Sequence, residues 1–125
     1  MLRVAPYYAA ILALGYVFLA LQVIRARRTA KVSLGTGGKP EVMRASRVHG
    51  NFAEYVPFAL LLLAMLELRG APAWTLHALG VALVVGRTSH AFGVSRTPEN
   101  FQYRIAGMMT TFGVLILSAL AIFLT

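Results

Sequence analysis

The segment from Arg44 to Pro57, RASRVHGNFAEYVP, carries the polar side chains of this sequence that are best suited to chemistry. It runs directly into the apolar stretch FALLLLAML, so it predicts the first half of a membrane-spanning helix. On a helical wheel of ~100° per residue, one arc of ~100° holds Arg44, Arg47, Asn51, Glu54 and Tyr55. Charged groups at membrane depth are costly and need partners. This shared face therefore predicts a polar pocket between helices.

The residue types on this face indicate what such a pocket would bind. Arg44 and Arg47 offer forked donors that match carboxylates. Glu54 can accept from an ammonium group, and Asn51 can both donate and accept. A small zwitterion with several carboxylates and one amine fits this set. The polarity ends before Leu60, which favours a pocket open to one side of the membrane over a channel lining.

Later segments add polar residues that we expect on the same side of the membrane, namely Arg87, His90 and Arg104. His49 falls near ~200° on the wheel, away from the main face, so we expect it to pack on a neighbouring helix or subunit. The three histidines show no i, i+4 spacing with a partner acid. We therefore predict no metal site.

Two simpler interpretations of these charges stay open. Glu54 could form a purely structural ion pair with Arg47 or Arg87. Arg44, Arg87 and Arg96 could extend their side chains to the lipid headgroups instead of lining a pocket, and for Arg96 we favour that interpretation.

The composition predicts the elements that position these residues. The chain has 125 residues, is 58% hydrophobic and only 13% charged, and has a mean hydropathy of +0.71. A soluble domain carries roughly 25% charged residues, so we predict an all-α integral membrane protein. Four apolar runs predict a single four-helix bundle over residues 1–125, with transmembrane helices at about 6–25, 41–68, 73–92 and 103–124.

The charge pattern predicts the orientation in the membrane. The net charge is +8, but ten of the twelve basic residues lie in or beside the two segments 25–47 and 93–103. The positive-inside rule places both segments in the cytoplasm and both termini on the opposite side. This patterning favours membrane orientation over nucleic-acid binding. Tyr7, Tyr8 and Trp74 are predicted to anchor helix ends at the membrane interface.

Two further predictions come from the first apolar run and from the absence of cysteine. The basic cluster follows the first apolar run instead of preceding it, so we predict a retained helix and not a cleaved signal peptide. The chain has no cysteine, so any thiol chemistry would use a thiol brought by a ligand.

The stretch RxxRxHxNxxEYxP, Arg44 to Pro57, closely resembles the second-helix signature of the MAPEG family, the membrane-associated proteins in eicosanoid and glutathione metabolism. LQVIRARRTAKVS, Leu21 to Ser33, resembles the end of the family's first helix and its basic loop. GRTSH, Gly86 to His90, and QYRIAG, Gln102 to Gly107, resemble its third-helix motif and the start of its fourth helix. The resemblance covers nearly the whole chain and indicates a short, bacterial-type member.

The resemblance implies a homotrimer with glutathione held between adjacent subunits. By motif position, it implies that glutathione is held by Arg27, Arg47, Asn51, Glu54 and Tyr55. His90 stands where some members have a tyrosine. The resemblance to the prostaglandin-synthase branch implies that His90 also contacts glutathione. Arg104 matches the arginine that faces the glutathione sulfur in the leukotriene-synthase branch, and a cation there favours the nucleophilic thiolate. The loop from Val94 to Phe101 is a few residues longer than in that branch.

Three functions follow as hypotheses. The leading one is a glutathione-dependent membrane transferase, with peroxidase activity toward lipid hydroperoxides as a variant, acting on hydrophobic electrophiles that arrive through the bilayer. The family also contains a non-catalytic binder, so a lipid- or glutathione-binding membrane protein is the alternative. A small-molecule exporter subunit is the third, although the polar face that stops halfway along helix 41–68 argues against it.

Overall fold

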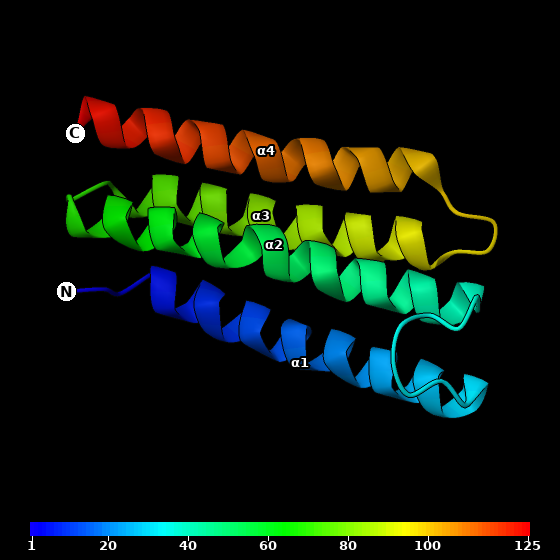
Figure 1. The fold of residues 1–125 in the computed structure, drawn as a ribbon. Helices are drawn as coiled ribbons and strands as arrows, with labels where there is room; N and C mark the ends of the chain where they lie inside the picture. The colour runs from blue at the N-terminus through cyan, green and yellow to red at the C-terminus, as the bar shows by residue number, and fades with distance from the viewer.

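The computed structural model describes all 125 residues and contains four α-helices and no strand. They are α1 (Ala5–Ala30), α2 (Pro40–Leu68), α3 (Ala73–Ser95) and α4 (Phe101–Leu124). The helices run alternately up and down, so that both termini lie at one end of the bundle (Figure 1). The connections 31–39 and 96–100 lie together at the opposite end. We call these the terminal end and the loop end.

The helix ends follow local backbone chemistry. Pro40 begins α2, where its missing N–H costs nothing, and the Asn100 side chain caps α4 by accepting from the Tyr103 backbone N–H at 3.2 Å. Helix α1 continues five residues beyond the predicted end, through the basic stretch to Ala30. Arginine is a good helix former, so a cluster of charge need not end a helix. The loops are accordingly shorter than the predicted segments 25–47 and 93–103.

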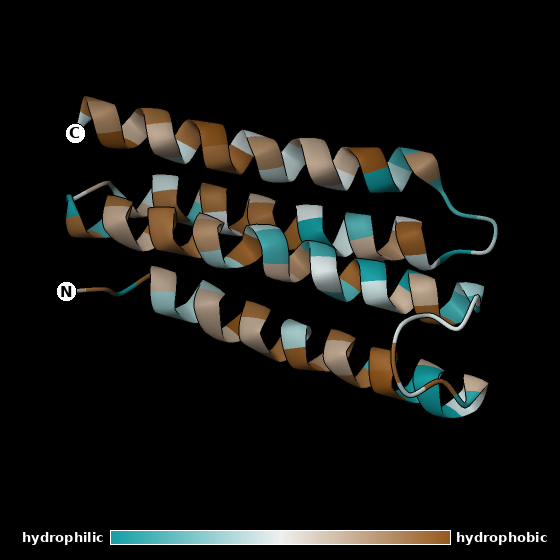
Figure 2. Cartoon of the chain, viewed as in Figure 1, coloured by the Kyte–Doolittle hydropathy of each residue, from teal (hydrophilic) through white to brown (hydrophobic).

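Three of the helices are long and apolar enough to cross a membrane: α1, α2 and α4. They carry large exposed apolar side chains, such as Leu14 and Leu21 on α1 and Ile116 on α4. Hydrophobic residues are spread along α1 and α4 (Figure 2). Helix α3 falls short of the same criterion. Its second half contains the polar run RTSH, in which Arg87 and His90 are buried inside the bundle, whereas Thr88 is exposed and Ser89 is half-buried.

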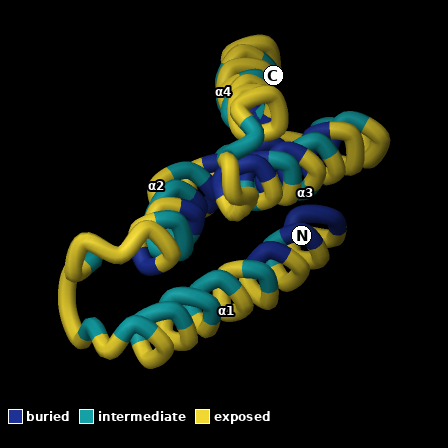
Figure 3. Tube along the Cα trace, turned by 90° about the vertical axis from the view of Figure 1, so that its right-hand side faces the viewer, coloured by how far each residue is buried: buried dark blue, intermediate teal, exposed yellow.

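Helix α3 lies at the centre of the arrangement. It packs most extensively on α4 and also contacts α2 and α1, whereas α1 and α4 do not touch (Figure 3). The apolar core occupies the terminal half of the bundle, where Leu12, Leu63, Leu66, Leu76 and Leu83 are almost fully buried. Toward the loop end this core stops, near Leu12 on α1, Phe52 on α2 and Leu83 on α3.

The terminal end is fastened by Glu67, which accepts hydrogen bonds from the backbone N–H groups of Arg3, Val4 and Ala5. Tyr8, which we predicted as an interfacial anchor, is buried here instead. Its hydroxyl bonds His77 Nδ1 at 2.9 Å, and its ring covers Gly80, where any Cβ would collide with it. With the terminal end closed, the open spaces of the molecule lie at the loop end.

Candidate functional site

A polar cavity of about 420 Å³ lies at the loop end, between α2, α3 and α4. It brings together residues that are far apart in the sequence and that we had singled out from residue type and position. Its lining contains Arg44, Arg47, Asn51, His90 and Arg104. Pro40, Met43, Val94 and Glu99 complete it. Four of these nine side chains are basic or imidazole groups against a single carboxylate, so the cavity suits an anionic solute.

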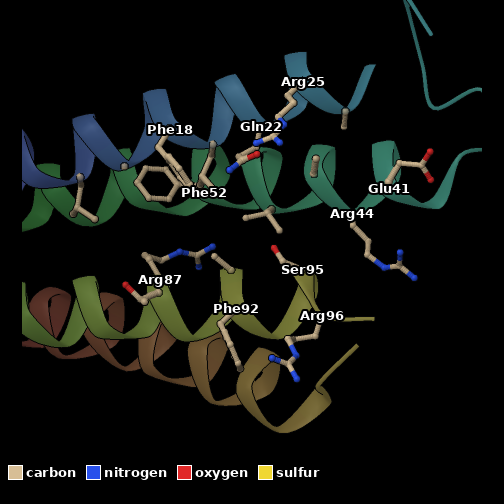
Figure 4. A pocket seen from close by; sticks show the side chains of 18 of the residues that line it. Phe18, Gln22, Arg25, Glu41, Arg44, Phe52, Arg87, Phe92, Ser95 and Arg96 are labelled. Atoms are coloured by element: carbon tan, nitrogen blue, oxygen red, sulfur yellow. The ribbon is translucent and has the colours of Figure 1, made fainter. Parts of the chain in front are cut away.

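Arg87 forms the inner support of this cavity. Its side chain reaches from α3 toward α2 (Figure 4), and with 4% of its surface exposed it does not extend to the headgroups. It donates to Asn51 Oδ1, to Thr111 Oγ1 at 3.2 Å and to His90 Nδ1 at 3.4 Å. No carboxylate pairs with it, and its Nε is buried without a partner. Arg87 is therefore a buried cation held by neutral groups.

The hydrogen bonds of Arg87 fix the polarity of its two neighbours. A guanidinium only donates, so Asn51 must turn its oxygen, and His90 its unprotonated Nδ1, toward Arg87. Asn51 then has only N–H donors left, and His90 has its Nε2–H. Both residues line the cavity, so the polar side chains around that space present hydrogen-bond donors, with the carboxylate of Glu99 as the exception. Such a lining selects a ligand rich in acceptors, above all carboxylates.

Arg104 lies in the first turn of α4 and forms an ion pair with Glu99 at 2.7 Å. Close packing of the helices sets its position. A Cβ at Gly93 of α3 would run into the backbone nitrogen of Arg104 and the carbonyl oxygen of Asn100. Glycine thus lets α4 approach α3 at the level of the cavity. Glu99 was not predicted as a site residue. The sequence indicated its role only by its position in the polar loop, five residues before Arg104.

Arg47 and Glu54 form an ion pair at 3.6 Å, as the structural interpretation of Glu54 allowed. We expected these charges to be buried, but in a single chain their side chains are 57% and 52% exposed. An exposed pair contributes only about 0–1 kcal/mol. Glu54 and Tyr55 do not line the cavity, and Tyr55 packs edge-on against Phe112 of α4 with ring centroids 5.6 Å apart.

Two other predicted residues lie on the α1 side. Arg27 donates to the carbonyl of Gly35 at 2.6 Å and is absent from the cavity. His49 stacks on Tyr16 of α1 with ring centroids 4.8 Å apart. It therefore packs on a neighbouring helix, facing away from the cavity.

The fold and the polar cavity define a class of protein, a helical integral membrane protein with a cavity rich in basic side chains at one end. A family model for the MAPEG family matches residues 5–124, and the chain belongs to that family. The inner membrane protein YecN of Escherichia coli K12 is 36% identical over 118 residues, which cover 94% of this chain and 88% of YecN. YecN of the E. coli O6:H1 strain matches equally well. The MAPEG family includes glutathione transferases, and its members often bind glutathione.

Proposed function

We propose that this protein is a glutathione-dependent membrane transferase that works as a homotrimer with α3 as its fourth membrane crossing. The observation that supports this most is the donor-lined cavity, where Arg44, Arg47, Asn51, His90 and Arg104 converge on one space. Glutathione carries two carboxylates and one ammonium group, and it supplies the thiol that this cysteine-free chain lacks. Arg44 and Arg47 would hold carboxylates, and Glu54 would receive the ammonium group.

The trimer would complete the binding site. Glu54 and Tyr55 lie beside the cavity, and Arg27 lies on the far side of the same chain. A neighbouring subunit that placed its α1 against this face would add its Arg27 to the cavity. It would also cover the half-exposed Arg47–Glu54 pair. The basic loop end would face the cytoplasm, where glutathione is available.

In the proposed reaction, Arg104 stabilises the thiolate of bound glutathione. A free thiol of this kind has a pKa of ~8.5, and each unit by which a cation lowers it corresponds to ~1.4 kcal/mol. The thiolate sulfur attacks the electrophilic carbon of an apolar substrate, the C–S bond forms as the leaving group departs, and the thiol proton goes to solvent. The substrate would approach from the bilayer. With a lipid hydroperoxide, the thiolate would attack the terminal oxygen, and the O–O bond would break to release the lipid alcohol after protonation. A second glutathione thiol would then displace water from the resulting sulfenic acid to give the disulfide.

Glu99 provides the specific observation in favour of the alternative, a binder without turnover. Its carboxylate neutralises part of the Arg104 charge at 2.7 Å, which weakens thiolate stabilisation. The exporter hypothesis has no such support, because the apolar core closes the bundle beyond Asn51 and Arg87.

Titration calorimetry with glutathione in detergent, followed by conjugation of a chlorinated nitroaromatic, tests the proposal. Arg47→Ala should weaken binding tenfold or more, because a charge-assisted hydrogen bond contributes about 1.5–3 kcal/mol. Arg104→Gln should lower turnover while affinity changes little. Glu99→Gln should raise the ultraviolet thiolate signal of the complex, whereas Arg28→Gln, at the exposed end of α1, is the control. Binding without any conjugation would establish the binder, and no binding would refute the site.

A further inference from the structure

A second and larger hollow lies on the other side of the α2–α3 pair, between these helices and α1. It is a groove of about 930 Å³, and its lining runs from Arg25, Arg44 and Arg96 near the loop end to Phe18, Phe52 and Arg87 nearer the core (Figure 4). It exists because α1 stays close to α2 but contacts α3 only sparsely. Of the residues that line the cavity, only Arg44 also lines this groove.

The groove is amphipathic along its length. Its inner part is lined mainly by the apolar residues Ile11, Leu12, Phe18, Leu19, Phe52 and Val84, with Gln22, Arg87 and Thr88 as polar exceptions. At its mouth stand Arg25, Arg44 and Arg96, with Glu41 as the one acid (Figure 4). The two ion pairs of the chain involve none of these four residues. Arg96 lies over the ring of Phe92 at 5.1 Å, which holds its guanidinium beside the opening.

We propose that this groove binds one anionic phospholipid, with its phosphate among Arg25, Arg44 and Arg96 and one acyl chain along the apolar inner part. Basic pockets between membrane helices are a known mode of anionic headgroup binding. The length fits as well. From Arg25 to Ile11, α1 rises about 21 Å at 1.5 Å per residue, more than the ~15 Å of hydrocarbon in one leaflet.

Charge argues against a second copy of the chain as the occupant. Neighbours in a ring whose axis is normal to the membrane keep the same orientation. Each neighbour would bring its own basic loop end, which carries ten of the twelve basic residues, toward three unpaired arginines. An apolar electrophile is no better a match, because it would leave the same charges without a counter-ion. The phosphate of a phospholipid would neutralise the arginine charges, and the acyl chain of the same molecule would occupy the apolar part of the groove. This inference does not depend on the proposed transferase activity.

Gly15 offers a direct way to block the groove. It lines the groove on α1, and a Cβ added there meets nothing within 4 Å. Gly15→Phe would therefore fill the space without disturbing the backbone. Gly113 on α4 is the matched control, because a Cβ there also meets nothing and the residue does not line the groove.

Native mass spectrometry of the full chain in detergent, titrated with dioleoyl phosphatidylglycerol, dioleoyl phosphatidylethanolamine or oleate, provides the test. We expect one phosphatidylglycerol per chain, bound more tightly than the other two lipids. Arg25→Gln and Arg96→Gln should each weaken it about fivefold, the equivalent of one arginine–lipid attraction. Gly15→Phe should abolish it, and Gly113→Phe and Arg28→Gln should leave it unchanged.

Four outcomes would overturn the proposal. Equal affinity for phosphatidylethanolamine would remove the role of the arginines, and tighter binding of oleate would replace the phospholipid with a fatty acid. If Arg28→Gln weakened phosphatidylglycerol binding as much as Arg25→Gln and Arg96→Gln do, the binding would reflect the general surface charge and not a site in the groove. Unchanged binding in Gly15→Phe would place the lipid outside the groove.

Discussion

At the scale of single residues, the donor-only chemistry of Arg87 governs the cavity. One buried guanidinium holds Asn51, Thr111 and His90, which belong to three different helices. It orients the amide of Asn51 and the ring of His90 so that their remaining polar groups are donors. The orientation of the hydrogen-bond donors in the cavity thus depends on a side chain that does not line it.

Replacement of Arg87 by lysine separates charge from geometry. Lysine keeps the cation but loses the planar fork, so it cannot hold Asn51, Thr111 and His90 together. We expect Arg87→Lys to weaken glutathione binding about tenfold, since hydrogen bonds to charged groups contribute about 1.5–3 kcal/mol. Nitrogen NMR of the His90 ring should show the Nε2–H tautomer in the native chain and a mixture in the variant. Arg69→Lys, at the terminal end, is the control.

Unchanged affinity together with an unchanged His90 tautomer in Arg87→Lys would mean that Arg87 does not orient these side chains. A loss of thermal stability alone, without a change in the tautomer, would assign the residue a purely structural role.

At the scale of the elements, the contact between α3 and α4 sets where Arg104 stands. A Cβ at Gly107 would come within 2.5 Å of the Gly86 carbonyl oxygen and of the His90 backbone nitrogen. Together with Gly93, these small residues let the two helices approach backbone to backbone.

Gly107→Ala should therefore destabilise the bundle by about 1–3 kcal/mol, the usual cost of overpacking. It should also lower glutathione affinity, because the new methyl group would displace His90 from its position in the cavity. Gly113→Ala, where the new methyl group meets nothing, should leave both properties intact. Thermal unfolding in detergent and calorimetry measure the two effects. Equal melting temperatures for the two variants would contradict the close contact.

The sequence predicted the four helices and the polar face from Arg44 to Tyr55, because helical periodicity and hydropathy are local properties. It did not predict the burial of Arg87, since a polar run in α3 can face lipid headgroups or the bundle interior equally well by composition. The groove beside α1 was also missed, because it depends on how far α1 stands from α3. Tyr8 was assigned to the interface because its partner Gly80 lies far along the chain.

At the scale of the whole molecule, the two hollows divide the loop end between opposite sides of the α2–α3 pair. The face with the cavity carries Glu54 and Tyr55, and the face with α1 carries Arg27 and His49. A single chain therefore separates residues that the family resemblance assigns to one glutathione site. Contact between unlike faces of neighbouring subunits would reunite them.

Mixed trimers test this arrangement. Chains with Arg27→Gln and chains with Arg104→Gln should each conjugate poorly alone. When the two are co-expressed, about a quarter of the interfaces in a ring of mixed subunits would combine an intact Arg27 with an intact Arg104. Activity should return in the mixture and be measurable with the nitroaromatic assay. If both residues acted within one chain, the mixture would show no recovery.

Arg44 belongs to both hollows, and this shared wall has a thermodynamic consequence. A phosphate on one side and a carboxylate on the other would draw on the same positive charge, so each guest should reduce the affinity of the other. Linkage requires the two reductions to be equal in size. Glutathione titrations at rising phosphatidylglycerol should therefore reveal antagonism, and Arg44→Gln should abolish it. Membrane lipid composition would then set how readily the protein takes up its soluble partner.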